Sequence, residues 1–177
     1  TERKNLQSKS SSLEDFYRSL GMEAELLVAS PKNLARIHQL IHKTNQFNLT
    51  TKRLTAKELE RLASHDDCFC YCYSLKDKYS DYGIITVFIA EKVSGDWEIN
   101  TWLMSCRTMG RGVENSVFDH FLSSALTEGE TVLGEYIATE KNKPISGLLE
   151  KMGFTQNSQN GSSSFTVGKN KNPKAEY

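Results

Sequence analysis

The sequence predicts one domain of mixed α/β (α+β) class, built on a mostly antiparallel β-sheet. The chain has 177 residues, which is close to the usual size of a single domain. Apolar residues make up 38% of it and charged residues 25%, as in globular rather than disordered chains. Segments with strand and helix spacing follow one another in the order β-α-α-β-β-β-α-β-α-β-β, so a mixed sheet is expected.

The two ends of the chain differ in composition from its middle. Residues 1–23 begin with a polar, Ser- and Lys-rich stretch and then acquire helical spacing, which predicts a linker and an N-terminal helix. Residues 24–168 carry the strand and helix patterns of the domain itself. Residues 169–177 form a polar tail.

Two helices are predicted after the first strand of the domain, which covers residues 25–29. Ser30 and Pro31 predict the start of the first helix, because a Ser side chain accepts from a free N–H group and Pro suits the first turn. Thr55 and Glu58 have the spacing of a capping box and predict the start of the second.

Three strands are then predicted at residues 68–75, 83–90 and 97–104. The links between them are too short for a crossover, so they should form an antiparallel meander. Cysteines and aromatic residues alternate from Cys68 to Cys72, which places these cysteines on one strand face. Their spacing fits neither a zinc site nor a disulfide framework, and reduced thiols are expected.

The second half of the domain alternates helices and strands. A strongly amphipathic helix covers residues 113–125 and a strand covers residues 132–139. Pro144 predicts the start of a final helix. Two last strands are predicted, one starting at Phe154 and one at residues 163–167.

The balance of charge restricts the partners of the domain. The chain has 22 basic and 22 acidic residues, and so gives no general electrostatic reason to bind nucleic acid or an acidic membrane. No apolar run has the length of a membrane span, and the N-terminus lacks a signal-peptide pattern, so a cytoplasmic protein is expected. Any bound anion must be held locally.

The clearest local site is the glycine loop, residues 105–112, between a predicted strand and a predicted helix. Gly110 and Gly112 allow the backbone to approach a ligand closely. Free N–H groups at the helix start favour a phosphate or diphosphate, and Arg107 and Arg111 can add charged hydrogen bonds. The alternative is an ordinary strand-to-helix turn with solvated arginines.

These residues resemble a known family. The spacing Arg107-x-x-Gly110-x-Gly112 resembles the pyrophosphate-binding pattern of the GNAT acyltransferase superfamily, and the segment from Asn142 to Phe154 is similar to the superfamily's C-terminal pattern. In outline the resemblance covers residues 24–168. It implies a twisted sheet flanked by helices on both faces, with a splayed strand pair that holds the pantetheine arm.

A narrower resemblance involves three stretches: TNQFNLTTKRLT (44–55), WLMSCRTMGRGVE (102–114) and GEYIATEKN (134–142). They are similar to the C-terminal domain of FkbH-like proteins, which carry a haloacid-dehalogenase (HAD)-type domain upstream and are associated with loading acyl carrier proteins for polyketide synthesis. This resemblance implies an upstream HAD-type domain and an acyl carrier protein as partner.

The resemblance also assigns roles to residues. The ligand would be acetyl-CoA, another acyl-CoA or a phosphopantetheine thioester, with no metal. Leu103 and Met104 would face pantetheine, and Asn142 would contact the thioester arm. The diphosphate would be surrounded by Arg107, Gly110, Arg111, Gly112 and Val113.

The chain departs from the family pattern at the catalytic group. Many GNAT enzymes have a Tyr in the last helix that protonates the leaving thiolate, and this chain has Leu149 there. The remaining candidates are Glu135 as a base, Tyr136 as a proton donor and Cys106 as a nucleophile. Each also has a structural interpretation, respectively a solvated strand residue, a core aromatic residue and a small buried residue.

The polar connection between the two predicted helices offers Asn45, Gln46 and Asn48 as contacts for the acyl group or acceptor, or as turn and capping residues. Three hypotheses follow for the whole domain. The first is an acyltransferase, the second is a non-catalytic module that grips a phosphopantetheine arm, and the third is a nucleotide-binding domain unrelated to acyl transfer.

Overall fold

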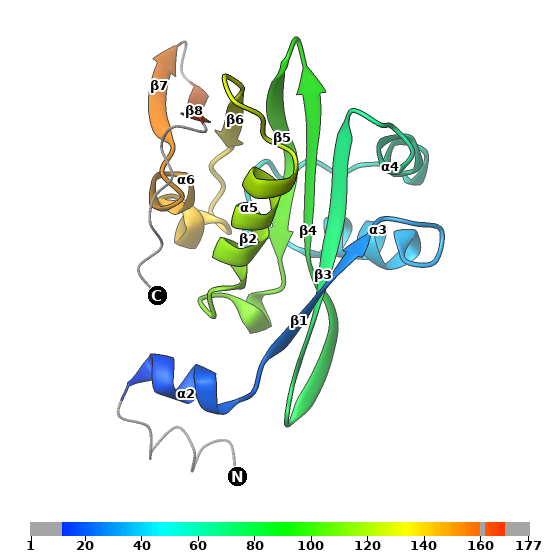
Figure 1. The fold of residues 1–177 in the computed structure, drawn as a ribbon, viewed down its shortest axis with the longest axis vertical. Coiled ribbons are helices and arrows are strands. Elements are labelled where there is room, and N and C mark those ends of the chain that lie inside the picture. The colour runs from blue at the N-terminus through cyan, green and yellow to red at the C-terminus, as the bar shows by residue number, and fades with distance from the viewer. Residues whose placement is uncertain (1–11, 160–161, 169–177) are drawn as a thin grey trace.

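The computed structural model describes residues 12–159 and 162–168, and within them the strands form one eight-stranded sheet (Figure 1). The spatial order is β1-β3-β4-β5-β6-β8-β7, and β2 pairs with β5 outside that order. The strands are β1 (Glu23–Val28), β2 (Phe47–Asn48), β3 (Cys68–Asp77), β4 (Ser80–Val93), β5 (Asp96–Met104), β6 (Thr131–Tyr136), β7 (Thr155–Gln159) and β8 (Ser162–Gly168).

The helices follow the predicted order. They are α2 (Leu13–Ser19), α3 (Leu34–Lys43), α4 (Ala56–Ala63), α5 (Val113–Ser124) and α6 (Leu148–Lys151), with short 3-10 turns η1 (Cys106–Thr108) and η2 (Lys143–Ile145). The Ser12 side chain caps α2 by accepting from the Asp15 N–H group. The capping box predicted at Thr55 and Glu58 is present at the start of α4. The polar tail and the linker before Ser12 lie outside the described residues.

Most neighbouring strands are antiparallel, as the sequence predicts, and β5 and β6 are parallel. The β5–β6 pairing covers two residue pairs, Trp97 with Val132 and Glu98 with Leu133. Beyond them β5 pairs with β2 instead. The two parallel strands therefore meet at one end and separate at the other, which is the predicted splay.

Helices cover both faces of the sheet (Figure 1). The cluster beneath α3 and α4 includes Cys70 and Cys72, whereas the cluster beneath α5 and α6 includes Phe69 and Tyr73. The strict alternation of cysteine and aromatic residues along β3 produces this division, because successive strand side chains point to opposite faces. Burial raises the pKa of Cys70 to about 12, so its thiol stays protonated.

Aromatic contacts fix α5 against β5. The Trp102 ring stacks on Phe118 with centroids 5.6 Å apart, and Phe121 lies 5.5 Å from Trp97 in an edge-to-face contact. Such pairs add roughly 1 kcal/mol each beyond the apolar area that they bury. The strand before the glycine loop and the helix after it are thus held together, and the loop between them is positioned at both ends.

The helix α3 starts later than predicted. It begins at Leu34, after Asn33, and not at Ser30 and Pro31. Asn33 Oδ1 accepts from the Ser30 N–H group at 2.8 Å, and its Nδ2 donates to the Val28 carbonyl at 2.9 Å. These bonds close a turn after β1, so the Ser30 side chain does not act as the helix cap.

Other predicted boundaries were also wrong. The predicted link between strands 68–75 and 83–90 is largely strand, because the β3–β4 ladder continues as far as the pair Asp77 and Ser80. The strand predicted at residues 132–139 ends at Tyr136. The final helix does start near Pro144, but it breaks at Gly147 into η2 and α6. The two-residue strand β2 was not predicted.

Candidate functional site

The glycine loop leaves β5 at Met104, forms the turn η1 and enters α5. Gly110 has a φ of 71° and Gly112 a φ of 80°, a left-handed conformation that L side chains rarely adopt. A Cβ atom built at either position would have nothing within 4 Å. The glycines are therefore required by the backbone shape, and the space beside them is open.

The loop also offers hydrogen-bond donors. Within the described ranges, the backbone N–H groups of residues 109–115 donate to no side chain. They also donate to no backbone carbonyl, apart from bonds inside regular helices and strands. The first three N–H groups of α5 have no partner within the helix by geometry, and the helix dipole adds a partial positive charge there. An anion is the natural partner of such a group of donors.

A cleft of about 410 Å³, which we call the loop cleft, opens beside these donors. The glycine loop, the start of α5, the segment from η2 to α6 and β2 enclose it. The lining residues are Phe47, Met109, Gly110, Glu114, Asn115, Pro144, Ile145, Gly147, Leu148, Lys151 and Met152. Of the residues that the sequence assigned to the site, only Gly110 is among them. Charge is brought to this cleft by Lys151 and Glu114, which were not predicted as site residues from the sequence.

The two arginines of the loop have different environments. Arg107 is exposed. Arg111 donates to the Arg107 carbonyl at 3.0 Å, lies 3.8 Å from the Asp77 carboxylate and stacks over the Tyr82 ring at 5.0 Å. Its side chain is only 10% exposed. Arg111 therefore ties the loop to the β3–β4 hairpin, and Arg107 is the arginine that remains available to a ligand.

The splay between β5 and β6 is filled by the chain itself. Residues 47–50, which we call the wedge segment, pair with the C-terminal end of β5, placing Phe47 opposite Met104. The Leu49 N–H group donates to the Trp102 carbonyl at 3.1 Å, and the Leu49 carbonyl accepts from the Ile137 N–H group at 2.9 Å. The wedge segment thus bridges the strands that separate.

Leu103 and Met104, predicted to face pantetheine, have 0% exposure, and their register partners are Asn48 and Phe47. A further carbonyl of the same strand, that of Asn100, accepts from the Thr50 hydroxyl at 3.0 Å. An arm that paired with β5 here would compete with the wedge segment. The role of Leu103 and Met104 in ligand binding stays a prediction.

Asn142 was predicted to contact the thioester arm, and it is buried with 0% exposure. Its Nδ2 donates to the carbonyls of Asn48 and Ile137 at 3.0 and 2.9 Å. Its Oδ1 accepts from the Thr139 N–H group at 2.7 Å and lies 3.1 Å from the Tyr136 hydroxyl. Asn142 therefore holds the wedge segment against the end of β6, and its amide N–H groups are used within the chain.

The candidate catalytic residues lie in separate places. Tyr136 packs against the core, and its hydroxyl is bonded to Asn142. Glu135 is partly buried on the same strand. Cys106 is exposed in η1. Leu149 is 1% exposed, and a Cβ atom at Gly134 would lie 2.9 Å from its Cδ2 atom. None of the four lines the loop cleft.

The polar residues of the helix connection act mainly on the backbone. Asn48 donates to the Thr44 carbonyl and accepts from the Thr51 N–H group at 2.9 Å, so it is a turn residue. Asn45 accepts from the Arg53 guanidinium, and Gln46 is exposed. Their predicted contact with a substrate stays a prediction.

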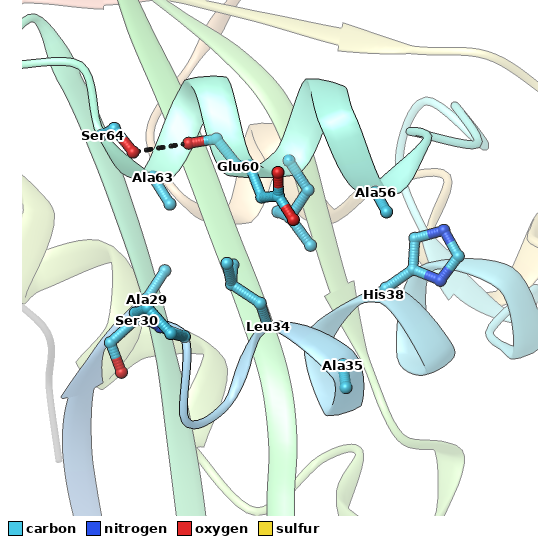
Figure 2. A pocket seen from close by; sticks show the side chains of 11 residues that line it. Ala29, Ser30, Leu34, Ala35, His38, Ala56, Glu60, Ala63 and Ser64 are labelled. Carbon is cyan, nitrogen blue, oxygen red and sulfur yellow. Dashed lines mark hydrogen bonds between the residues drawn. The ribbon is translucent and has the colours of Figure 1, made fainter.

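A second cavity, of about 650 Å³, lies between α3 and α4 on the face opposite to α5 (Figure 2). Leu34 and Glu60 point into the gap between the two helices. No residue of the glycine loop lines it. Although this cavity is larger, we place the candidate site at the loop cleft, because the unpartnered N–H groups are there.

Comparisons with solved structures identify the fold. An acetyltransferase from Thermus thermophilus is 13% identical, with a TM-score of 0.61, and the match covers 82% of this chain and 96% of that one. The GNAT domain of S. lividans PAT is 16% identical, with a TM-score of 0.62 and coverage of 82% and 90%. The chain has the GNAT fold. No protein-family model and no curated protein matches the sequence.

A third GNAT-fold neighbour is the spermidine N-acetyltransferase from Vibrio cholerae, solved in complex with CoA and spermine. It is 13% identical, with a TM-score of 0.58 and coverage of 83% and 96%. The predicted fold class is thereby confirmed. At this level of identity the resemblance to FkbH-like proteins stays a prediction.

The described residues form neither a membrane-spanning helix nor a metal site. Within the described ranges, no helix is long and apolar enough to cross a bilayer. In the same part of the chain, no three His, Cys, Asp or Glu side chains gather as a metal site would require. The His38 and His42 rings lie 4.4 Å apart, and His42 Nε2 is 3.0 Å from the Leu54 carbonyl.

Proposed function

We propose that this chain is an acyltransferase domain that binds an acyl-CoA, or the phosphopantetheine thioester of a carrier protein, at the loop cleft. The observation that carries the proposal is the glycine loop: its unpartnered N–H groups stand beside a cleft and at the start of a helix fixed by core packing. The GNAT fold and the CoA bound by the Vibrio cholerae neighbour support a diphosphate at this loop.

In this proposal the diphosphate accepts from the loop N–H groups, and Arg107 and Lys151 add positive charge. The acceptor attacks the thioester carbonyl carbon, the carbon–sulfur bond breaks, and the thiol leaves with a proton that originates from the acceptor. Holding both reactants together supplies much of the rate enhancement. Tyr136, Glu135 and Cys106 remain candidates for proton transfer or attack.

The resemblance of residues 44–55, 102–114 and 134–142 to FkbH-like proteins extends the proposal. It favours an acyl carrier protein as donor and a HAD-type domain upstream. Holo acyl carrier protein should then compete with CoA for the loop cleft. If CoA binds equally well in the presence of holo acyl carrier protein, this extension is contradicted.

A second candidate function is a binding module that grips a phosphopantetheine arm without turnover. The wedge segment favours it, because residues 47–50 already occupy the β5 edge at which an arm would pair. Leu149 favours it too, because a Leu side chain cannot protonate a thiolate. Release of thiol from acetyl-CoA in the presence of amines separates the two functions: turnover supports the enzyme, and tight binding without turnover supports the module.

Binding itself is tested by calorimetry with acetyl-CoA and a matched pair of glycine variants. Gly112→Ala places a side chain at a φ of 80° in the loop, and Gly129→Ala places one at a φ of 86° in a turn outside the cleft. Both positions are open, so both variants carry a similar backbone strain of roughly 1 kcal/mol. We expect only Gly112→Ala to weaken acetyl-CoA binding, by about tenfold. Equal effects of the two variants, or no binding by the parent protein, would contradict the proposed function.

A further inference from the structure

Arg111 is a nearly buried cation that connects two separate parts of the chain. Its Nη2 atom donates at 3.0 Å to the Arg107 carbonyl, four residues back, and so closes the half of the glycine loop that contains Gly110. On its other side it meets the β3–β4 hairpin. Asp77 Oδ2 lies 3.8 Å from its Nη1 atom, and its guanidinium lies 5.0 Å from the centre of the Tyr82 ring. The side chain therefore holds the loop from within and is itself held from outside.

Asp77 supplies the counter-charge to Arg111 and is itself fixed. Its side chain has 0% exposure, whereas that of Arg111 is 10% exposed. Its Oδ1 atom accepts from the N–H groups of Tyr79 and Ser80, each at 2.9 Å. Its Oδ2 atom accepts from the Tyr82 hydroxyl at 2.9 Å. Three donors thus hold the carboxylate in a place where Oδ2 faces the guanidinium.

A nearly buried guanidinium needs a negative partner. Removing one member of a buried ion pair leaves an uncompensated charge, which is strongly unfavourable. Without the Asp77 charge, Arg111 would gain by turning towards water, and the Arg107 carbonyl would then lose its donor. The shape of the glycine loop thus depends on a carboxylate that does not line the loop cleft.

We propose that Asp77 is a positioning residue, which acts through Arg111 to keep the glycine loop in the shape that binds a diphosphate. The inference rests on the proposed function and adds the β3–β4 hairpin to the parts of the chain that support that site. The resemblance to the GNAT superfamily implies a different role for Arg111, which is direct contact with the diphosphate.

The two roles of Arg111 have opposite consequences when the Asp77 charge is removed. If Arg111 holds the loop, the loop loses its support and binds a diphosphate more weakly. If Arg111 contacts the diphosphate, the same change frees the guanidinium, removes a repulsive carboxylate and strengthens binding. The sign of the effect therefore distinguishes the two roles.

The test is calorimetry with acetyl-CoA on Asp77→Asn and on a matched control, Asp81→Asn. In Asp77→Asn the side-chain oxygen still accepts from the two N–H groups of the turn, so the turn is kept and the charge is lost. Asp81 is exposed on the same hairpin, and its Oδ1 atom accepts from the Gly83 N–H group at 2.8 Å. Both variants remove one negative charge and preserve one turn, but of the two carboxylates it is Asp77 that pairs with Arg111.

We expect Asp77→Asn to weaken acetyl-CoA binding about tenfold, because the ligand must then order the loop at the expense of its binding free energy. Asp81→Asn should change binding by less than about twofold. Arg111→Gln should weaken binding about as much as Asp77→Asn does. The double variant should bind no more weakly than the weaker single variant, because the two residues act as one unit. A role of Asp77 in hairpin stability alone would not produce this coupling.

Thermal unfolding of each variant shows whether binding is measured on folded protein. If Asp77→Asn does not fold, Tyr82→Leu tests the same link, because it keeps both charges and removes the ring beside the guanidinium. We expect Tyr82→Leu to weaken acetyl-CoA binding about threefold. Unchanged binding by a folded Tyr82→Leu protein would contradict the inference.

Stronger binding of acetyl-CoA by Asp77→Asn would overturn the inference, since it would show that Arg111 reaches the ligand when released. Equal weakening by Asp77→Asn and Asp81→Asn, or additive losses in the double variant, would also overturn it. If Gly112→Ala weakens binding and Asp77→Asn does not, the inference fails and the proposed function stands. If the parent protein does not bind acetyl-CoA, both fail.

Discussion

The two ends of β5 reach β6 in different ways. At the N-terminal end, Trp97 and Glu98 pair directly with β6, and the Glu130 carboxylate locks this end through Lys92 and the Trp97 indole N–H group. At the C-terminal end the wedge segment lies between the strands and is held by the neutral amide of Asn142. One end is secured by charge and the other by uncharged hydrogen bonds, so changes of pH and substitutions can loosen them separately.

The largest effect is expected at the neutral end. Asn142→Leu should lower the free energy of unfolding by about 3 kcal/mol, because two carbonyl groups and one N–H group lose a buried partner. Urea denaturation measures the loss. Amide exchange should accelerate at Leu49 and Ile137 but not at Val132. Equal acceleration at Val132 would show that the two ends of β5 do not open separately.

The charged end should depend on pH. The hydrogen bond from Lys92 is the main cause that lowers the pKa of Glu130 to about 2. The stabilisation is therefore complete above the ordinary pKa of 4.5 and is lost as pH falls towards 2. Glu130→Gln should cost about 2 kcal/mol at pH 7, and this deficit should shrink between these pH values.

The same pH series distinguishes the two anchors. The deficit of Asn142→Leu should stay constant over the range in which that of Glu130→Gln disappears, because the Asn side chain does not titrate. A Glu130→Gln deficit that stays the same above and below the ordinary carboxyl pKa would contradict an ionic lock at the N-terminal end of β5.

The smallest effect concerns one bond of the wedge segment. Thr50→Val removes the hydroxyl that donates to the Asn100 carbonyl and keeps the volume of the side chain. The expected cost is about 1 kcal/mol, measured by urea denaturation. Thr155→Val, at an exposed position on β7, is the control and should change stability little. Equal losses of stability in Thr50→Val and Thr155→Val would show that the Thr50 hydrogen bond does not stabilise the wedge segment.

Local patterns were sufficient to predict most of the elements. Apolar spacing located α3, α4, α5 and the meander, and Thr55 with Glu58 located a helix start, because these signals lie within a few residues of each other. The glycine loop was predictable for the same reason: Gly110 and Gly112 were assigned to a backbone turn and do have positive φ values.

Contacts between distant segments were not predictable in this way. β2 has two residues, too few for any periodicity, and its pairing with β5 depends on Asn142, which is far away in the chain. Arg107 and Arg111 look equivalent in the sequence, and only the folded β3–β4 hairpin shows that Arg111 is engaged by Asp77. Glu114 had no signal in the sequence beyond its place on the first helical turn.

Arg111 contacts Asp77 and Tyr82, and so connects the glycine loop to the tip of the β3–β4 hairpin. Lys78, at that tip, is exposed. A fluorophore attached there would lie outside the loop cleft, on the hairpin that the Arg111 side chain contacts. The hairpin tip is therefore a position at which a label can be placed to follow ligand binding without altering any residue that lines the loop cleft.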